Sequence, residues 1–387
     1  MKIGTDFSGI GAPEMALKYL GIDFKSVFAC EIDKYARQSF KQLHEPKTFY
    51  NDITTRNHKE VEQLDLYIAG FPCQSFSIAG KRKGFEETRG TLFFNVAEFI
   101  KENQPKTFIL ENVKGLLSHD KGKTFQTIVD ILSNGGGTQN GQISLDMFED
   151  GLGYHIYWQV LNTKNYGIPQ NRERIFIVGF KDFRDFNFPK KMPLELKLGD
   201  MLQDNANSKY YLSNKGIENL NKNQEFNKFN PLNIDSEFSA CITARCNKIS
   251  NDNNFIEVDD KYYLSDKVVK RIDDNLKEKD KENNTNEIRT HYLGGRKGDN
   301  KKGGTGHLCK TDGTTYCLDT ANSQAIENNN KIRRLTPLEC WRLQGFKDED
   351  FFSVKDVSDS QLYKQAGNSI TVNVLMEIFK KIYVNNK

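Results

Sequence analysis

Residues 1–180 alternate between short apolar segments and segments with helical spacing, and this alternation limits the possible folds most. The apolar segments at 2–5, 26–30, 66–69, 107–110, 157–161 and 174–179 are typical of buried strands. Segments with helical spacing lie between them at 13–20, 33–43 and 91–100. Continuous apolar strands separated by helices indicate an α/β fold with a parallel sheet covered on both faces.

The composition changes near residue 181. Residues 181–332 are rich in Asn, Lys, Asp and Gly and contain only short apolar runs, which predicts a separate, mostly irregular and β-rich domain. Residues 209–215 (KYYLSNK) resemble residues 261–267 (KYYLSDK), so this region is either a duplicated unit or shows a chance similarity in a biased composition. Patterned helices return from residue 333.

Bulk properties favour a soluble protein of a reducing compartment. The chain has 387 residues, a formal net charge of +3 and seven cysteines without a CxxC pair. An odd cysteine count without regular spacing argues against a disulfide scaffold. The N-terminus has no apolar signal region and no run is long enough to span a membrane, so we expect a cytoplasmic protein. The mild basic balance permits nucleic-acid binding without requiring it.

A glycine-containing turn, FSGIGAPE at 7–14, follows the first predicted strand and opens the first helix. Gly9 and Gly11 would let the backbone approach a ligand beside a helix N-terminus, although a tight strand–helix turn explains them equally well. Glu31 ends the second strand, where an acid can hold ribose hydroxyls, and Asp52 follows the third, where it could accept from an adenine amino group. We therefore predict a cofactor that contains adenosine. Glu14 stands where a dinucleotide fingerprint has its third glycine, which disfavours NAD.

Cys73 in GFPCQSFS directly follows a predicted strand end, where open α/β sheets place their sites. Taken alone, it could be a small buried residue, a metal ligand, half of a disulfide or a nucleophile. A nucleophilic thiolate needs nearby positive charge, and 81–83 (KRK) supply it in a glycine-bounded loop.

Charged residues also lie at the ends of two later strands. Glu111, in ENV, follows the apolar strand at 107–110 and could bridge donor and acceptor atoms of a heterocycle, or cap a helix. In QNRER, Arg172 and Arg174 alternate and would share one face of an extended chain. Two guanidiniums on one face suit phosphate or carbonyl oxygens, and a surface ion pair is the alternative.

In this order, FSGIGAPE, GFPCQSFS, ENV, QNRER, RRLTPLECWRLQGF and QAGNSI resemble the motifs of the cytosine-C5 DNA methyltransferases of bacteria and phages. The resemblance covers 1–180 and 333–387, and the loop at 72–92 fits almost throughout. It implies a Rossmann-like, S-adenosylmethionine-dependent methyltransferase sheet. The catalytic and cofactor-binding domain would span 1–180, completed by about 350–387, with a smaller, β-rich target-recognition domain at 181–349.

The resemblance also implies roles for individual residues. Cys73 matches the nucleophile, Glu111 the carboxyl on the cytosine edge, and Arg172 and Arg174 the flanking arginines. The cofactor-binding positions are Phe7, Ser8, Gly9, Gly11, Glu31, Ile32, Asp52, Ile53, Pro72, Leu92, Asn368 and Ser369. The candidate DNA contacts in the loop are Ser75, Ser77, Lys81 and Arg89. In the recognition region we expect contacts from Arg245, Lys248, Arg296 and Lys297, for which a basic surface face is the alternative reading.

The chain departs from the family pattern in two places. Ala12 replaces a third glycine, and Cys317 replaces the threonine of a Thr-Leu pair in the recognition region, for which 241–242 (Cys-Ile) is a second candidate. His307, Cys309 and Cys317 match no standard zinc spacing, so we expect no metal.

The resemblance implies duplex DNA as the partner of a monomeric enzyme, with a separate restriction endonuclease as a candidate second partner. The alternatives are an RNA (tRNA) cytosine-C5 methyltransferase and a non-catalytic DNA-binding regulator on the same scaffold. The long region at 181–332 favours DNA over RNA. The target sequence cannot be deduced from residue spacing.

Overall fold

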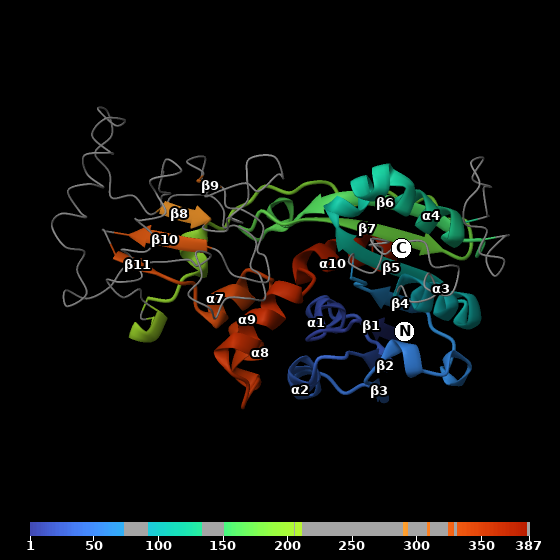
Figure 1. Ribbon diagram of the computed structural model, residues 1–387, viewed down its shortest axis with the longest axis horizontal. Helices are drawn as coiled ribbons and strands as arrows, with labels where there is room; N and C mark the ends of the chain where they lie inside the picture. The colour runs from blue at the N-terminus through green and yellow to red at the C-terminus, as the bar shows by residue number, and fades with distance from the viewer. Residues whose placement is uncertain are drawn as a thin grey trace, which may run out of the picture.

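The computed structural model describes residues 1–72, 92–133, 151–204, 206–210, 289–292, 308–309, 324–328 and 331–384. Within these ranges, a seven-stranded sheet is flanked by helices on both faces (Figure 1). Its strands are β1 (Lys2–Asp6), β2 (Lys25–Cys30), β3 (Thr48–Tyr50), β4 (Leu66–Ala69), β5 (Thr107–Val113), β6 (His155–Asn162) and β7 (Glu173–Phe180).

The helices α1, α2 and α3 lie close to their predicted positions, helices return after residue 333 as predicted, and α4 was not predicted. They are α1 (Ala12–Tyr19), α2 (Lys34–Leu43), α3 (Leu92–Asn103), α4 (Lys123–Leu132), α7 (Pro337–Arg342), α8 (Asp348–Ser353), α9 (Asp359–Asn368) and α10 (Val372–Phe379). Short 3₁₀ helices are η1 (Ile53–Thr55), η2 (His58–Glu60), η5 (Lys114–Gly122), η7 (Thr163–Tyr166), η8 (Leu198–Met201) and η9 (Ser208–Tyr210), and a π-helical turn, η12 (Lys380–Val384), follows α10. Local signals place several starts: Asp33 caps α2 through the N–H groups of Tyr35 and Ala36, and Pro13 opens α1.

The strand order is β3-β2-β1-β4-β5-β7-β6. The chain builds outward from β1 to β3, then returns to β4 on the other side of β1, so the order reverses between β1 and β4. Ligands of open α/β sheets bind outside the carboxyl ends of the strands at such a reversal. The fold therefore marks the carboxyl ends of β1 and β4 as the place to look for a site.

The prediction of a wholly parallel sheet is wrong for β7, which runs antiparallel to both β5 and β6. The apolar residues of β7 would be buried in a parallel or an antiparallel strand, so the hydrophobic pattern did not predict the direction of β7. Ten residues separate β6 from β7. This connection is shorter than the dozen or more residues that a parallel crossover needs. The short connection was the available signal.

Successive residues along a strand pack alternately into two separate hydrophobic cores. Leu66 and Ile68 of β4 belong to the cluster under α1 and α10, whereas Tyr67 and Ala69 belong to the cluster under α3 and α4. This follows from the period of two along a strand. Both faces are apolar, which explains the continuous hydrophobic runs of the sequence.

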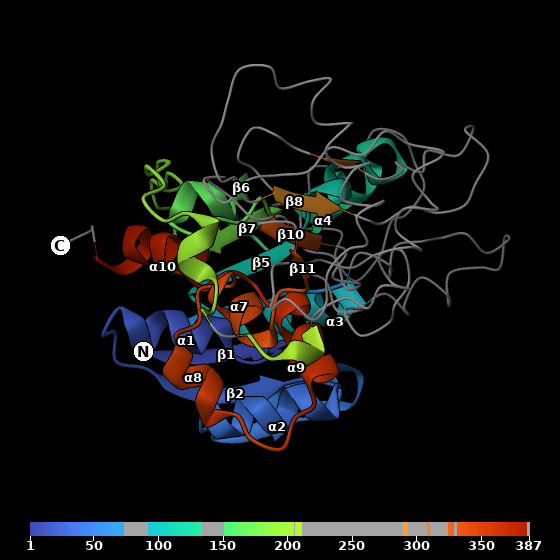
Figure 2. The ribbon, with the colours of Figure 1, turned by 90° about the vertical axis from the view of Figure 1, so that its left-hand side faces the viewer.

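The C-terminal helices pack against the N-terminal part of the chain. Figure 2 shows α7, α8 and α9 beside α1 and α2, and α10 packs on α1. Trp341, Leu375 and Phe379 are fully buried in the same cluster as Ile3 and Met15. The cluster also includes Phe186, Leu198 and Met201, so the first part of the segment assigned to the recognition region packs into this core.

A second, four-stranded antiparallel sheet lies within the region predicted to be β-rich. Its order is β11-β10-β8-β9, from β8 (Arg289–Tyr292), β9 (Leu308–Cys309), β10 (Gln324–Asn328) and β11 (Lys331–Arg333). It is separate from the seven-stranded sheet (Figure 1). The second KYYLS copy and most of the first lie outside the described residues.

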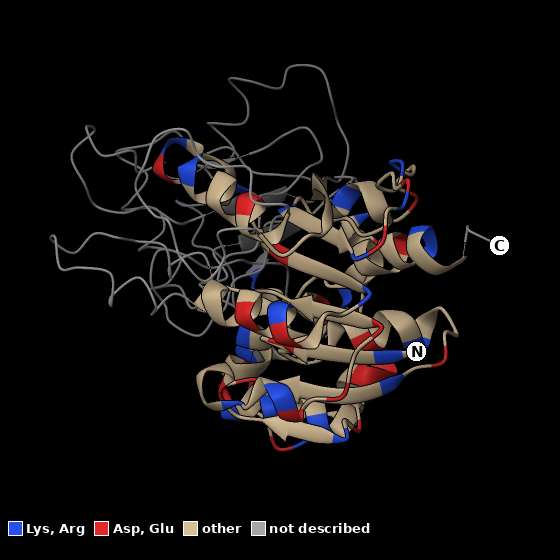
Figure 3. Cartoon of the chain, turned by 90° about the vertical axis from the view of Figure 1, so that its right-hand side faces the viewer, with Lys and Arg blue, Asp and Glu red and all other residues tan. Residues whose placement is uncertain are grey.

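Acidic and basic residues are interspersed on the face shown in Figure 3. This agrees with the small net charge of +3. Among the described residues, none of the helices has the length and apolar character needed to cross a bilayer.

Candidate active site

A small pocket lies at the carboxyl ends of β1 and β4. The predicted residues among those that line it are Phe7, Ser8, Gly9, Glu111, Asn368 and Ser369. The others, which the sequence did not single out as ligand-binding, are Thr5, Asp6, Ala12, Pro13, Ile68, Gly70 and Ile370. Ala12, Pro13, Gly70 and Ile370 lie within the quoted motifs, and Thr5, Asp6 and Ile68 lie near the ends of β1 and β4; these were the signals that could have found them.

The turn between β1 and α1 has an unusual backbone. Phe7, Gly9 and Gly11 have φ angles of 53°, 55° and 81°. Such angles are rare for a residue like Phe7, and backbone strain of this kind concentrates at ligand sites. A Cβ placed on Gly9 would meet nothing within 4 Å, so this glycine presents bare backbone to open space beside the pocket. A Cβ on Gly11 would lie 2.3 Å from the His44 ring, so Gly11 is required by packing.

Ser8 secures the turn to the neighbouring strand. It is 7% exposed, and its hydroxyl accepts from the N–H of Cys30 at 2.9 Å. The N–H of Ser8 donates to the carbonyl of Cys30 at 3.0 Å. The predicted cofactor residue Ser8 therefore shapes the pocket through the backbone of β2.

Glu31 follows β2 and reaches the turn. Its Oε2 accepts from the N–H of Gly9 at 2.9 Å and its Oε1 from the N–H of Asp33 at 2.8 Å. Burial raises the pKa of this carboxyl above its usual value, although both backbone N–H groups oppose the shift. The carboxyl thus lies beside the pocket with lone pairs that could accept from ribose hydroxyls.

Ile32, the next residue, is 73% exposed. Asp52 lies at the same edge of the sheet, because Tyr50 pairs with Cys30. Its Oδ1 accepts from the N–H and the hydroxyl of Thr54, both at 2.8 Å. Ile53 is 5% exposed, so its side chain belongs to the core.

Glu111 and Arg174 form an ion pair on adjacent strands. Nε of Arg174 lies 3.2 Å from Oε1 of Glu111, and both side chains are largely buried. The sequence predicted both at strand ends; the antiparallel pairing of β5 with β7 brings them together. Burial lowers the pKa of Arg174, and the Glu111 carboxylate opposes this shift. The pair places one acceptor group and one donor group side by side next to the pocket.

The Arg172 side chain binds backbone carbonyl groups of the C-terminal segment. It is 3% exposed, and its Nη2 donates to the carbonyls of Gly367 at 3.2 Å and Ser369 at 2.9 Å. These carbonyls belong to the segment that lines the pocket. Arg172 therefore joins the strand of Arg174 to the pocket wall formed by Asn368 and Ser369.

Asn112, next to Glu111 on β5, holds the chain that leads to Pro72. Its Nδ2 donates to the carbonyl of Phe71 at 2.9 Å, which fixes the chain just before Pro72. Pro72 is exposed and Leu92 is half-buried, and they border the undescribed segment 73–91. The predicted residues that lie outside the described part of the chain are Cys73, Ser75, Ser77, Lys81, Arg89, Arg245, Lys248, Arg296 and Lys297. No group of three or more His, Cys, Asp or Glu in the described part could hold a metal ion.

Solved structures with the same fold come first. The fold matches a methyltransferase described as S. pombe Dnmt2, with a TM-score of 0.62, 16% identity and coverage of 98% of this chain and 97% of that one. It also matches a prophage-encoded structure from E. coli, described as a putative DNA modification methyltransferase, with a TM-score of 0.53 and 19% identity. This match covers 100% of both chains. At these identities the likeness shows a shared methyltransferase fold.

The sequence defines the family. The family model described as C-5 cytosine-specific DNA methylase matches residues 1–384. Among curated relatives, orphan methyltransferase M.SPRI of Bacillus phage SPR is 33% identical, over 100% of this chain and 99% of its own length. Type II methyltransferase M.HpaII of Haemophilus parainfluenzae is 35% identical, over 97% and 87% respectively. The chain belongs to the C-5 cytosine-specific DNA methylases and is a DNA (cytosine-5-)-methyltransferase.

Proposed function

We propose that this enzyme transfers the methyl group of S-adenosylmethionine to C5 of one cytosine in a specific duplex DNA sequence. The observation that carries the proposal is the pocket between β1 and β4, with the Glu111–Arg174 pair beside it. The uncovered Ile32, the acceptor groups of Glu31 and Asp52, and the open space at Gly9 fit an adenosine-containing cofactor.

The cofactor-binding roles divide along the pocket. Glu31 would accept from the ribose, Ile32 would cover the adenine ring, and Asp52 would accept from its amino group. Asn368 and Ser369 would close the opposite wall, which Arg172 holds in place. When bound, S-adenosylmethionine supplies an electrophilic methyl group.

The chemistry on the base needs a nucleophile and two polar partners. C5 of cytosine is a poor nucleophile, and addition of the Cys73 thiolate to C6 makes it enamine-like. Glu111 would hold N3 and the 4-amino group, and Arg174 would donate to O2. After methylation, a base removes the C5 proton and the thiol leaves. The ring must leave the base stack to reach Cys73, so the enzyme flips the cytosine out of the duplex.

The remaining roles belong to the loop and the recognition region. Ser75, Ser77, Lys81 and Arg89 would contact DNA from the loop after Cys73, and Arg245 and Arg296 from the recognition region. We propose a monomeric cytoplasmic enzyme with a separate restriction endonuclease as a candidate partner, as in restriction–modification systems.

The first experiment tests cysteine chemistry on DNA. Purified enzyme is incubated with duplex DNA, or with tRNA, and labelled S-adenosylmethionine, and bisulfite sequencing then gives the base and target. Cys73→Ser should lower methyl transfer by at least about 10³-fold, because a covalent route is lost. The matched control is Cys246→Ser, which changes a cysteine without a role in the proposal.

A covalent trap provides a second readout. Duplex DNA with 5-fluorocytosine at the identified target has no C5 proton to remove, so wild-type enzyme should stay attached and migrate as a larger species on a denaturing gel. The Cys73→Ser variant should not form this larger species. Full methylation by Cys73→Ser would overturn the nucleophile assignment, and transfer to tRNA alone would overturn duplex DNA as the substrate.

A further inference from the structure

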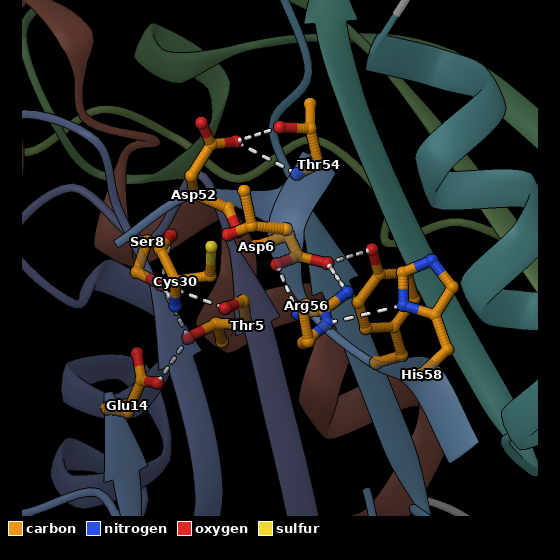
Figure 4. A network of polar contacts seen from close by, with 11 residues as sticks. Thr5, Asp6, Ser8, Glu14, Cys30, Asp52, Thr54, Arg56 and His58 are labelled. Carbon is orange, nitrogen blue, oxygen red and sulfur yellow. Dashed lines mark hydrogen bonds and ion pairs between the residues drawn. The ribbon is translucent and has the colours of Figure 1, made fainter. Parts of the chain in front are cut away.

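A buried ion pair lies beneath the pocket, between two segments that are distant in sequence (Figure 4). Nη1 of Arg56 donates to Oδ1 of Asp6 at 2.6 Å, and Nη2 donates to Oδ2 at 2.7 Å. Both side chains are completely buried. The hydroxyl of Tyr67 donates to Oδ2 of Asp6 at 2.6 Å, so three strong hydrogen bonds converge on one carboxylate.

Aromatic rings enclose the guanidinium. Cζ of Arg56 lies 4.4 Å from the ring centroids of both Phe28 and Phe99. A planar guanidinium can stack on rings while both of its terminal nitrogens bind a carboxylate, which a lysine cannot do. The position therefore requires arginine by geometry as well as by charge.

The pair joins two parts of the proposed cofactor site. Asp6 is the last residue of β1, precedes the strained Phe7 and lines the pocket. Arg56 directly follows η1, whose N-cap is Asp52. The bidentate contact thus fixes the glycine-containing turn relative to the Asp52–Ile53 segment.

A contribution to folding stability does not by itself explain why an ion pair is buried here. The cost of removing two charges from water often equals or exceeds their attraction, so apolar residues of similar volume stabilise a core equally well. What a bidentate pair adds is a defined distance and angle between the two segments that carry it.

We propose that Arg56 is a positioning residue that sets the spacing between the two halves of the cofactor pocket and thereby controls cofactor affinity. The proposal rests on the cofactor assignment made above. It predicts that a change at Arg56 alters cofactor binding more than it alters DNA binding.

The test measures binding directly, with S-adenosylhomocysteine as an unreactive probe in isothermal titration calorimetry. Arg56→Lys keeps the positive charge and loses the pair of nitrogens that bind both oxygens of Asp6. The dissociation constant should rise roughly tenfold or more, because ångström-scale displacement of binding groups costs one to two orders of magnitude. The dissociation constant for target DNA should change less than about twofold, since the printed partners of Arg56, such as Asp6, Phe28 and Phe99, are not among the proposed DNA contacts.

The chain offers a matched control in Arg333 and Glu339. This pair is also buried and bidentate, with both contacts at 2.7 Å, and neither residue lines the pocket. Arg333→Lys should lower the free energy of unfolding and leave the affinity for S-adenosylhomocysteine within about twofold. Urea unfolding of each variant reports the stability separately.

Tyr67→Phe is the second variant, for the case in which Arg56→Lys does not fold. It removes one hydrogen bond to Asp6 and keeps the ring, so the dissociation constant should rise about threefold. Unchanged affinity in Tyr67→Phe and Arg56→Lys, or an equal loss in Arg333→Lys, would overturn the proposal. Wild-type enzyme that binds no S-adenosylhomocysteine would instead contradict the cofactor assignment.

Discussion

Glu14, in the first turn of α1, is an acidic residue in a buried position. It is fully buried and its Oε1 accepts from the hydroxyl of Thr5 at 2.9 Å (Figure 4). Its Oε2 has no hydrogen-bond partner in the described part of the chain. Burial raises the pKa of this carboxyl from 4.5 to about 7, although hydrogen bonds oppose the shift. The sequence used Glu14 only to argue against NAD; the structure shows a buried acid that favours its neutral form.

This raised pKa predicts an unusual pH dependence of stability. Between pH 4.5 and 7 the unfolded chain releases the Glu14 proton and the folded chain retains it, so stability falls as pH rises through this window. The loss should reach about 3 kcal/mol near pH 7 and stay constant above it. Glu14→Gln keeps an acceptor for Thr5 and cannot ionise. Urea unfolding from pH 5 to 8 should show the variant gaining on wild type as pH rises; a constant difference would contradict the prediction.

At the scale of elements, the β1–α1 turn uses its two glycines for different purposes. Gly9 presents backbone to open space, whereas Gly11 makes room for the His44 ring. Burial of His44 lowers its pKa to about 3, so the ring against Gly11 is neutral. One turn therefore combines a glycine beside open space with a glycine required by packing.

Alanine at each position should separate these roles. Gly9→Ala should cost about 1–2 kcal/mol of stability, because the left-handed conformation disfavours a side chain, and should weaken binding of S-adenosylhomocysteine roughly tenfold. Gly11→Ala should cost about 3 kcal/mol or more, because the new Cβ also collides with His44. Thermal unfolding and calorimetry on both variants test this difference. Equal stability losses with equal affinity losses would show that the two glycines act alike.

At the scale of the whole molecule, the N-terminal sheet depends on the C-terminal helices. Trp341, Leu375 and Phe379 are fully buried in the core beneath α1. Arg172 and Thr163 add contacts from the other side of the chain: Arg172 donates to the carbonyl of Ser369, and the hydroxyls of Thr163 and Thr371 lie 3.0 Å apart. The pocket wall and the core therefore share one C-terminal segment.

Removal of the chain from Pro337 onward should abolish folding. Each large apolar side chain contributes about 1.5–3 kcal/mol on burial, so loss of α7 to α10 exceeds the roughly 5–15 kcal/mol of a typical domain. Circular dichroism should show no cooperative thermal transition for the truncated chain. Co-expression of residues 337–387 as a separate fragment should restore it. A truncated chain that melts cooperatively at the wild-type temperature would contradict this dependence.

The sequence by itself determined six strands of the main sheet and the first three helices, because apolar period and capping residues act locally; it did not reveal β3 or α4. It also predicted Glu111 and Arg174 at strand ends and Gly9 in a turn. The family motifs indicated the chemistry, since the same residue types in the same chain order mark a shared scaffold.

Only the tertiary structure decided which of these residues meet. The reversed direction of β7 puts Arg174 against Glu111, and the strand order brings Arg56 to Asp6 across 50 positions of sequence. For the first contact the sequence offered only the short connection before β7, and for the second it carried no sign. An apolar strand is buried equally well in either direction, and a buried ion pair depends on which strands become neighbours.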